Sequence, residues 1–165
     1  MIIWRNSNEV VKIKNENEII KMAIHPNGHL GSDFLIQIDT NHIIRTYFGT
    51  RNEIAIPTID ENFFSSIRNE EERELTYEEI QTVLSLANEL EETGVIDELG
   101  IADGTWEVVL IYNGVRYSMD YHIALSAATT GRTRHEGAYP INYYEIFLRL
   151  VDELVRLSPI EIEIY

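Results

Sequence analysis

The stretch that most constrains the fold is Trp106 to Tyr121, WEVVLIYNGVRYSMDY. Both halves are rich in β-branched and aromatic residues, and the Asn113-Gly114 pair between them is the strongest short-range signal for a β-hairpin. Apolar side chains alternate along both halves, and the first half carries further apolar residues on its second face. Such a strand belongs inside a sheet that is covered on at least one side. The sequence therefore predicts a hairpin within a packed sheet.

The first 59 residues have a similar character. Short runs of β-prone residues alternate with polar turns, and the clearest runs are 19–25, 34–39 and 43–48. Strands joined by such short turns pair antiparallel, because parallel neighbours need a long crossover. Shorter candidate strands lie at 1–4, 9–14 and 54–56.

Two later segments have helical periodicity. Thr76 and Glu79 have the spacing of a capping box, and apolar residues recur at helical intervals until Gly94, so we expect a helix at about 77–93. The second helix is expected to begin at Asn142, its predicted N-cap, and to end at Ser158-Pro159.

Other segments have weaker patterns. Residues 62–67 fit a short helix or a hinge, and 69–74 fit a charged loop. Residues 122–126 fit a strand extension or a short helix, whereas the small residues and glycines of 127–138 indicate a loop. Ile160 to Tyr165 alternates between apolar and polar residues, which predicts a final half-buried strand.

These elements predict an α+β fold, with an antiparallel β-sheet and two main amphipathic helices packed on one face. A chain of 165 residues suits a single domain, 1–165. We expect a β-rich half at 1–59, followed at 60–165 by a helix, the hairpin, a loop, a helix and a strand. The sheet face away from the helices is expected to be the more polar one.

The charge is strongly acidic and unevenly distributed. There are 28 acidic and 13 basic residues, which gives a formal charge of −15, and residues 60–98 hold 13 acidic residues against two basic ones. Direct nucleic-acid binding leaves a basic footprint that this chain lacks, and anionic membrane surfaces are disfavoured for the same reason. A basic protein is the expected partner.

Several classes of site are excluded or disfavoured. Because the chain has no cysteine, disulfides, thiol catalysis and cysteine metal sites are excluded. No glycine-rich nucleotide-binding motif occurs, and we expect no cofactor. The N-terminus does not resemble a signal peptide, and no apolar run approaches the length of a membrane span, so we expect a cytoplasmic protein.

Two histidine groups are candidates for chemistry. His25 and His29 flank a Pro-Asn-Gly turn near Asp33, a cluster that suits a metal but equally suits polar turn residues. Asp120 and His122 would face the same side of a strand, where the carboxylate would orient the imidazole. No nucleophile motif accompanies either group, and a structural role for these residues is the simpler interpretation.

The candidate binding residues form two sets. Glutamates cluster just before and within the start of the first predicted helix, and the only locally basic segment lies in the 127–138 loop. The two sets are Glu70, Glu71, Glu72, Glu74, Glu78 and Glu79, and Arg132, Arg134 and His135. Solvated glutamates and an ordinary mobile loop are the alternatives for these residues.

The composition favours a non-catalytic inhibitory protein that neutralises a basic partner. It is similar in character to immunity proteins that neutralise basic toxins, although no motif carries this resemblance. One alternative is a phage or mobile-element inhibitor that mimics nucleic acid with the Glu-rich 60–98 region. Another is a small enzyme with a site at Asp120, His122 and the 127–138 loop. The partner and the oligomeric state stay open.

Overall fold

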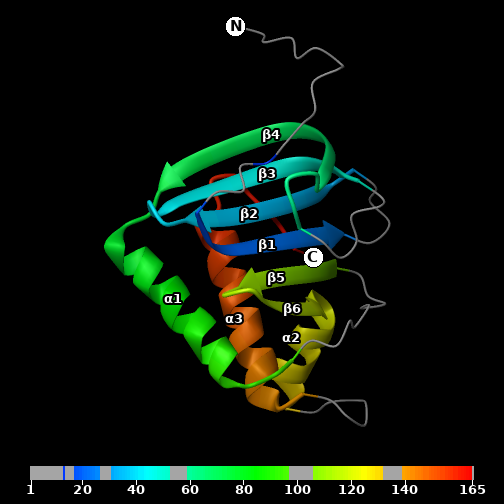
Figure 1. The fold of residues 1–165 in the computed structure, drawn as a ribbon. Coiled ribbons are helices and arrows are strands. Elements are labelled where there is room, and N and C mark those ends of the chain that lie inside the picture. The colour runs from blue at the N-terminus through cyan, green and yellow to red at the C-terminus, as the bar shows by residue number, and fades with distance from the viewer. Residues whose placement is uncertain are drawn as a thin grey trace, which may run out of the picture.

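A computed structural model describes residue 13 and residues 17–26, 31–52, 59–96, 106–131 and 139–164. These residues form a six-stranded antiparallel sheet with the strand order β4-β3-β2-β1-β5-β6, and helices lie on one side of it (Figure 1). The strands are β1 (Glu18–Pro26), β2 (Asp33–Asp39), β3 (Ile43–Arg51), β4 (Phe64–Glu74), β5 (Trp106–Tyr112) and β6 (Val115–Asp120). The helices are α1 (Tyr77–Glu92), α2 (Tyr121–Thr130) and α3 (Ile141–Leu157).

The predicted hairpin is present as β5 and β6. Asn113 and Gly114 form its turn with positive φ angles of 50° and 73°, as the tight turns of two-residue hairpins require. β5 also pairs with β1 along its whole length, from Ile20 opposite Tyr112 to Pro26 opposite Trp106. The doubly apolar strand therefore lies inside the sheet, as its sequence predicts.

The main core lies between the sheet and the helices, which confirms the α+β fold. Figure 1 shows α3 between α1 and α2, and its buried face includes Tyr143, Phe147 and Leu154. The strands contribute residues at alternate positions, such as Met22 and Ile36, and alternation along a strand places them all on the helix side. Helix α1 follows the predicted boundaries, and its capping box is present.

The opposite face of the sheet is less polar than predicted. Its centre carries a second apolar cluster, in which Leu35 and Tyr47 pack with Phe63 and Phe64. Ile13 and Ile59 complete this cover from outside the sheet. The prediction failed because the cover depends on where Ile13, Ile59 and Phe63 lie relative to the sheet, and a repeat pattern within one segment does not show which distant segment it packs against.

The segment 62–74 is the largest departure from prediction. Residues 69–74 were expected to be a loop, and 62–67 a short helix or hinge, yet Phe64–Glu74 is the longest strand of the sheet. Its backbone pairs with β3, from Arg51 opposite Phe64 to Ile43 opposite Glu74. Glutamate is rare in strands, but charged side chains are tolerated on a sheet edge, where they face solvent.

The chain after β6 forms a helix that includes part of the predicted loop. Asp120 ends the strand and caps α2, because its Oδ1 accepts hydrogen bonds from the backbone N–H groups of His122 and Ile123. Ala124 and Ala127 are buried on this helix, which ends at Gly131 in the left-handed conformation. The 122–126 ambiguity is therefore decided in favour of a helix, and the loop prediction is wrong for 127–130.

Both ends of α3 differ from prediction. The helix begins at Ile141 with Pro140 in the N-cap position, and no side chain caps it, so the predicted Asn142 cap is wrong. Residues 160–164 do not form a strand, although the predicted alternation is visible in the burial of Ile162 between exposed Glu161 and Glu163.

Several predicted features lie outside the described residues. These are the candidate strands at 1–4 and 54–56, most of the candidate at 9–14, and residues His29, Arg132, Arg134 and His135. Among the residues that are described, none of the helices is both long and apolar enough to cross a membrane.

Candidate functional site

The predicted acidic cluster lies on one edge of the sheet and on the helix start that follows it. Glu70, Glu71, Glu72 and Glu74 belong to β4, which pairs with β3 and is the last strand of the described sheet. After a turn at Leu75 and Thr76, α1 begins and brings in Glu78 and Glu79. The structure therefore brings all six predicted glutamates onto two consecutive elements.

Strand alternation divides the four β4 glutamates between two faces. Glu70, Glu72 and Glu74 are opposite Tyr47, Arg45 and Ile43. Glu71 and Arg73 alternate with them and point toward the helix side, where Arg73 reaches α1 and the end of α3. Glu70, Glu72 and Glu74 therefore lie on one face of the sheet, and Glu71 lies on the helix side.

On the face that carries Glu70, Glu72 and Glu74, Arg45 neutralises the charge of Glu72. Its side chain is mostly buried, and it donates from Nε to Glu72 Oε2 at 2.8 Å while Nη2 lies 2.6 Å from the same oxygen. Glu70 Oε1 lies further away, 4.0 Å from Nε. Burial is the largest single effect on Arg45 and opposes the charged guanidinium, but the hydrogen bond to Glu72 and the charges of Tyr47, Glu72 and Asp39 together outweigh it and raise the pKa of Arg45. Glu72 therefore has a structural role in holding β4 on β3.

Arg73 neutralises Glu79 on the other face. Its two terminal nitrogens donate to Glu79 Oε1 and Oε2 at 3.2 and 3.0 Å, and its Nε donates to the carbonyl of Leu157 at 3.0 Å. Glu79 also accepts the Thr76 backbone N–H in the capping box. The hydrogen bond from Arg73 is the main reason why the pKa of Glu79 falls to about 2. Through its bonds to Glu79 and Leu157, Arg73 therefore joins β4 to α1 and α3.

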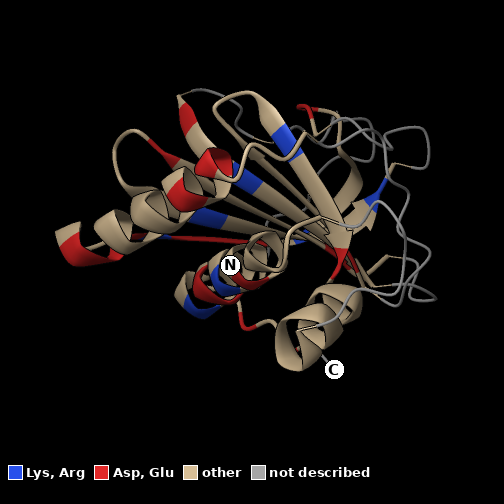
Figure 2. Ribbon diagram, turned by 90° about the horizontal axis from the view of Figure 1, so that it is seen from below, with Lys and Arg blue, Asp and Glu red and all other residues tan. Residues whose placement is uncertain are grey.

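Five of the six glutamates are exposed, and three of these five have no ion-pair partner among the described residues. Glu71, Glu74 and Glu78 are exposed, and their carboxylates form no ion pair with any of the residues that the structure describes. Figure 2 shows acidic residues in red at both ends of α1 and basic residues in blue on the sheet. We call Glu71, Glu74 and Glu78 the exposed acidic trio. Of the other three predicted glutamates, Glu72 and Glu79 are paired with arginines, and Glu70 lies 4.0 Å from Arg45.

The depressed pKa of Glu79 predicts a stability contribution that depends on pH. Because the folded-state pKa is about 2 and the ordinary value is 4.5, the ionised form stabilises the fold above pH 4.5. Replacing Glu79 with Gln should lower the free energy of unfolding by about 1 kcal/mol near neutral pH. This difference should largely disappear as the pH falls through 4.5 toward 2.

Urea denaturation of both proteins across this pH range measures the effect. Glu78→Gln is the matched control, because Glu78 is exposed in the same helical turn and lacks the Arg73 contact. The free energy of unfolding of Glu78→Gln should differ little from that of the unmodified protein over the whole pH range. A Glu79→Gln difference that stays constant between neutral and acidic pH would contradict the assignment.

His25 and Asp33 form a close pair on the face opposite the helices. His25 Nδ1 lies 2.5 Å from Asp33 Oδ1, and Asp33 Oδ2 accepts the Arg51 backbone N–H at 3.1 Å. Asp33 is only 1% exposed, so this carboxylate connects β1, β2 and β3 in the interior. In the described part of the chain no three His, Asp or Glu side chains are grouped to hold a metal, and His29 lies outside it.

Asp120 does not orient the imidazole of His122 as predicted. His122 lies in the first turn of α2, and the carboxylate of Asp120 is bound by backbone groups instead. Oδ2 accepts the Trp106 N–H at 2.7 Å, and Oδ1 accepts the N–H groups of His122 and Ile123. The expected strand geometry of this pair is wrong, because the strand ends at Asp120 and His122 belongs to α2.

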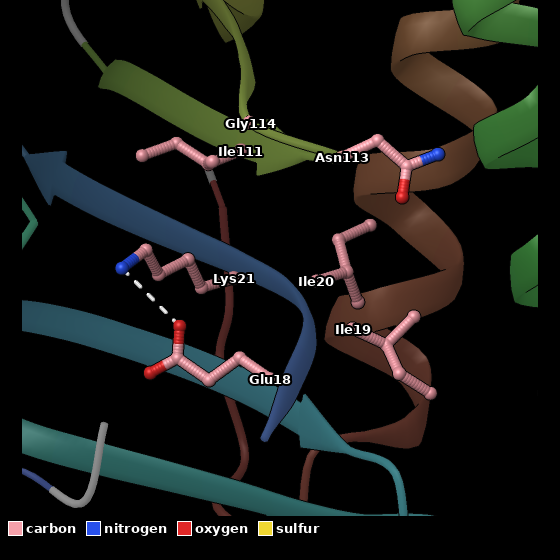
Figure 3. A pocket seen from close by; sticks show the side chains of 7 residues that line it. All are labelled: Glu18, Ile19, Ile20, Lys21, Ile111, Asn113 and Gly114. Atoms are coloured by element: carbon pink, nitrogen blue, oxygen red, sulfur yellow. Dashed lines mark ion pairs between the residues drawn. The ribbon is translucent and has the colours of Figure 1, made fainter. Parts of the chain in front are cut away.

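One hollow of about 370 Å³ lies beside the start of β1, and Figure 3 shows the side chains that line it. Lys21 and Ile111 extend to one side of β1, whereas Ile20 and Asn113 extend to the other. Lys21 Nζ lies 3.2 Å from Glu18 Oε2 and donates to the Ile59 carbonyl at 2.7 Å. Because these charges are paired and the side chains diverge, the hollow does not present converging polar groups to a ligand.

Sequence reasoning found the glutamates but missed Arg45 and Arg73, which decide which of them are free. Arg45 lies on a predicted strand, but its partner Glu72 lies 27 residues away on a segment predicted to be a loop. Only the pairing of β4 with β3 brings the two together.

Comparison with models of known protein families gives no match, and comparison with curated proteins gives no significant match. Any functional assignment therefore rests on the residues and their geometry.

Proposed function

We propose that this protein is a non-catalytic binding protein that neutralises a basic protein partner in the cytoplasm, in the manner of an immunity protein. The contact surface consists of β4 and the first turn of α1. The observation that carries the proposal is the exposed acidic trio, Glu71, Glu74 and Glu78, on the edge strand and the adjoining helix start. An uncompensated acidic surface attracts and orients a basic partner.

The position of Glu71 and Glu74 on β4, the last strand of the described sheet, suggests how the partner binds. An edge strand has backbone groups on its outer side that a strand from another protein can pair with. Glutamates along that edge repel a second copy of the same strand and favour a strand that carries Lys or Arg. The proposed contact therefore combines backbone hydrogen bonds with charge selection.

The arrangement of the glutamates does not favour mimicry of nucleic acid. A mimic needs a continuous row of free carboxylates along one face. Glu72, in the middle of the row from Glu70 to Glu74, is bound by Arg45. The row is therefore interrupted, and we do not extend the proposal to nucleic-acid-binding proteins.

Capture from a lysate of the native host tests the proposal. The immobilised protein should retain a basic protein, and retention should fall steeply between low and physiological salt because exposed charges are screened. Replacing the trio with Lys should abolish retention. The control replaces Glu89, Glu92 and Glu145, which are also exposed and give the same change in charge. Retention that ignores salt, or that both triple variants lose equally, would contradict the proposed surface.

A further inference from the structure

A second hollow, also of about 370 Å³, opens where the sheet meets the segment that follows α3. It combines an aromatic wall with two carboxylates. The lining residues that carry the argument are Pro26, Phe34, Phe48, Trp106, Glu161 and Glu163.

The wall is built by neighbouring strands in register. Phe34 on β2 is opposite Phe48 on β3, and their ring centroids are 4.8 Å apart with an angle of 34° between the planes. Pro26 on β1 is opposite Trp106 on β5, whose side chain is nearly buried. Strand pairing thus places several ring surfaces side by side on the helix face of the sheet.

The carboxylates come from the segment after α3, which is anchored to the sheet. Ser158 Oγ lies 2.7 Å from Thr46 Oγ1, and Ile162 is buried in the main core. Glu161 and Glu163 flank this buried residue and are themselves exposed. Neither of them pairs with a charged side chain in the part of the chain that the structure describes. Two free carboxylates are therefore held beside the aromatic wall.

Aromatic faces beside carboxylates are the chemistry that binds a guanidinium group. The ring face attracts the cation, and the planar fork donates paired hydrogen bonds to carboxylate oxygens. The chain itself provides an example, because the Arg68 guanidinium lies 4.5 Å from the centre of the Phe48 ring. Arg68 comes from β4, whereas Phe34 comes from β2 on the other side of β3. One ring of this aromatic wall, that of Phe48, is therefore already stacked by a guanidinium.

We infer that this hollow receives an arginine side chain of the basic partner, an inference that rests on the proposed function. Phe48 is opposite Asn69, the residue before Glu70, so the hollow adjoins the strand that carries the proposed contact surface. Arginine suits the site better than lysine because its planar group both stacks and forms paired hydrogen bonds. An arginine anchored in a pocket is a typical energetic centre of a protein interface.

The test uses N-acetyl-arginine amide as the probe and the fluorescence of Trp106 as the signal. A Trp4→Phe variant leaves Trp106 as the single tryptophan of the chain. The fluorescence should change in a saturable way with the arginine probe. The urea analogue, N-acetyl-citrulline amide, has the same shape without the charge and should bind at least about tenfold more weakly. Equal responses to the two probes would overturn the inference.

Paired substitutions locate the binding. Glu161→Gln with Glu163→Gln should weaken probe binding by about tenfold or more, because both substitutions remove charge from exposed positions beside the wall. Glu89→Gln with Glu92→Gln changes the net charge equally at exposed positions on α1 and should leave binding unchanged. Unchanged binding in the first variant, or equal losses in both, would overturn the inference.

The probe experiment is independent of the test of the proposed function. It needs no partner, and it leaves the exposed acidic trio intact. Failure of the probe with intact salt-sensitive capture would refute the arginine pocket alone. If the probe binds but both triple Lys variants lose capture of the partner equally, the acidic surface alone would be refuted.

Discussion

Gly49→Ala should lower the free energy of unfolding by about 3 kcal/mol, because β3 and β4 approach each other too closely there for any side chain. A Cβ atom on Gly49 would lie 2.1 Å from the carbonyl oxygen of Ser66 and 3.0 Å from the Cα of Ile67. Both atoms belong to the β4 backbone, which cannot rotate away as a flexible side chain would. The strand must shift, and the pairing that positions the acidic residues is strained with it.

Urea denaturation measures the loss, and Gly131→Ala is the control. Gly131 is in the left-handed conformation, with a φ of 65°, but a Cβ there meets nothing within 4 Å. Its substitution should cost only about 1 kcal/mol, the usual penalty for a non-glycine residue in that conformation. If Gly49→Ala were no more destabilising than Gly131→Ala, the close β3–β4 pairing would be wrong.

Asp120→Ala should be similarly destabilising, by about 3 kcal/mol. The carboxylate is 1% exposed and accepts three backbone N–H groups, from Trp106, His122 and Ile123. Removing it leaves the start of β5 and the first turn of α2 with donors that have lost their acceptor. Unsatisfied buried donors and a lost N-cap each cost on the order of 1–2 kcal/mol.

Amide hydrogen exchange makes this test specific. Protection should fall at Trp106, His122 and Ile123 in Asp120→Ala, together with the overall stability. Asp120→Asn keeps one oxygen acceptor but places an amide donor near a backbone N–H, so its loss should be intermediate. Unchanged protection of these three amides in Asp120→Ala would show that the carboxylate does not hold the hairpin to the helix.

Features whose signals are local were predictable from the sequence. The Asn113-Gly114 turn has the conformation that two-residue hairpins demand, and Thr76 and Glu79 form the expected capping box. Each signal depends on residues within a few positions of one another. The alternation of Glu161, Ile162 and Glu163 also predicted the correct burial, but an extended segment becomes a strand only when a neighbour accepts its hydrogen bonds.

The features that prediction missed depend on distant partners. β4 is rich in glutamate, a poor strand former, and only its pairing with β3 makes it a strand. Helix α2 begins at a carboxylate that also binds the start of β5, a role that sequence spacing does not reveal. The candidate surface was only partly predictable, because it too depends on distant partners. Its glutamates are visible in the sequence, whereas the arginines that neutralise Glu72 and Glu79 are brought to them by the fold.

The account predicts that the exposed acidic trio, and not the total charge, governs binding. The most direct measurement is titration calorimetry of the captured basic partner against three forms of this protein. They are the unmodified chain, Glu71→Lys/Glu74→Lys/Glu78→Lys, and Glu89→Lys/Glu92→Lys/Glu145→Lys. Both variants change the charge equally at exposed positions.

Three lost contacts of about 1 kcal/mol each correspond to a roughly hundredfold lower affinity for the trio variant. The control variant should bind within about threefold of the unmodified protein, because its changes lie away from the contact and act only through screened charge. Equal affinities of the two variants, whether both are reduced or both are unchanged, would contradict the proposal that β4 and the start of α1 bind the partner.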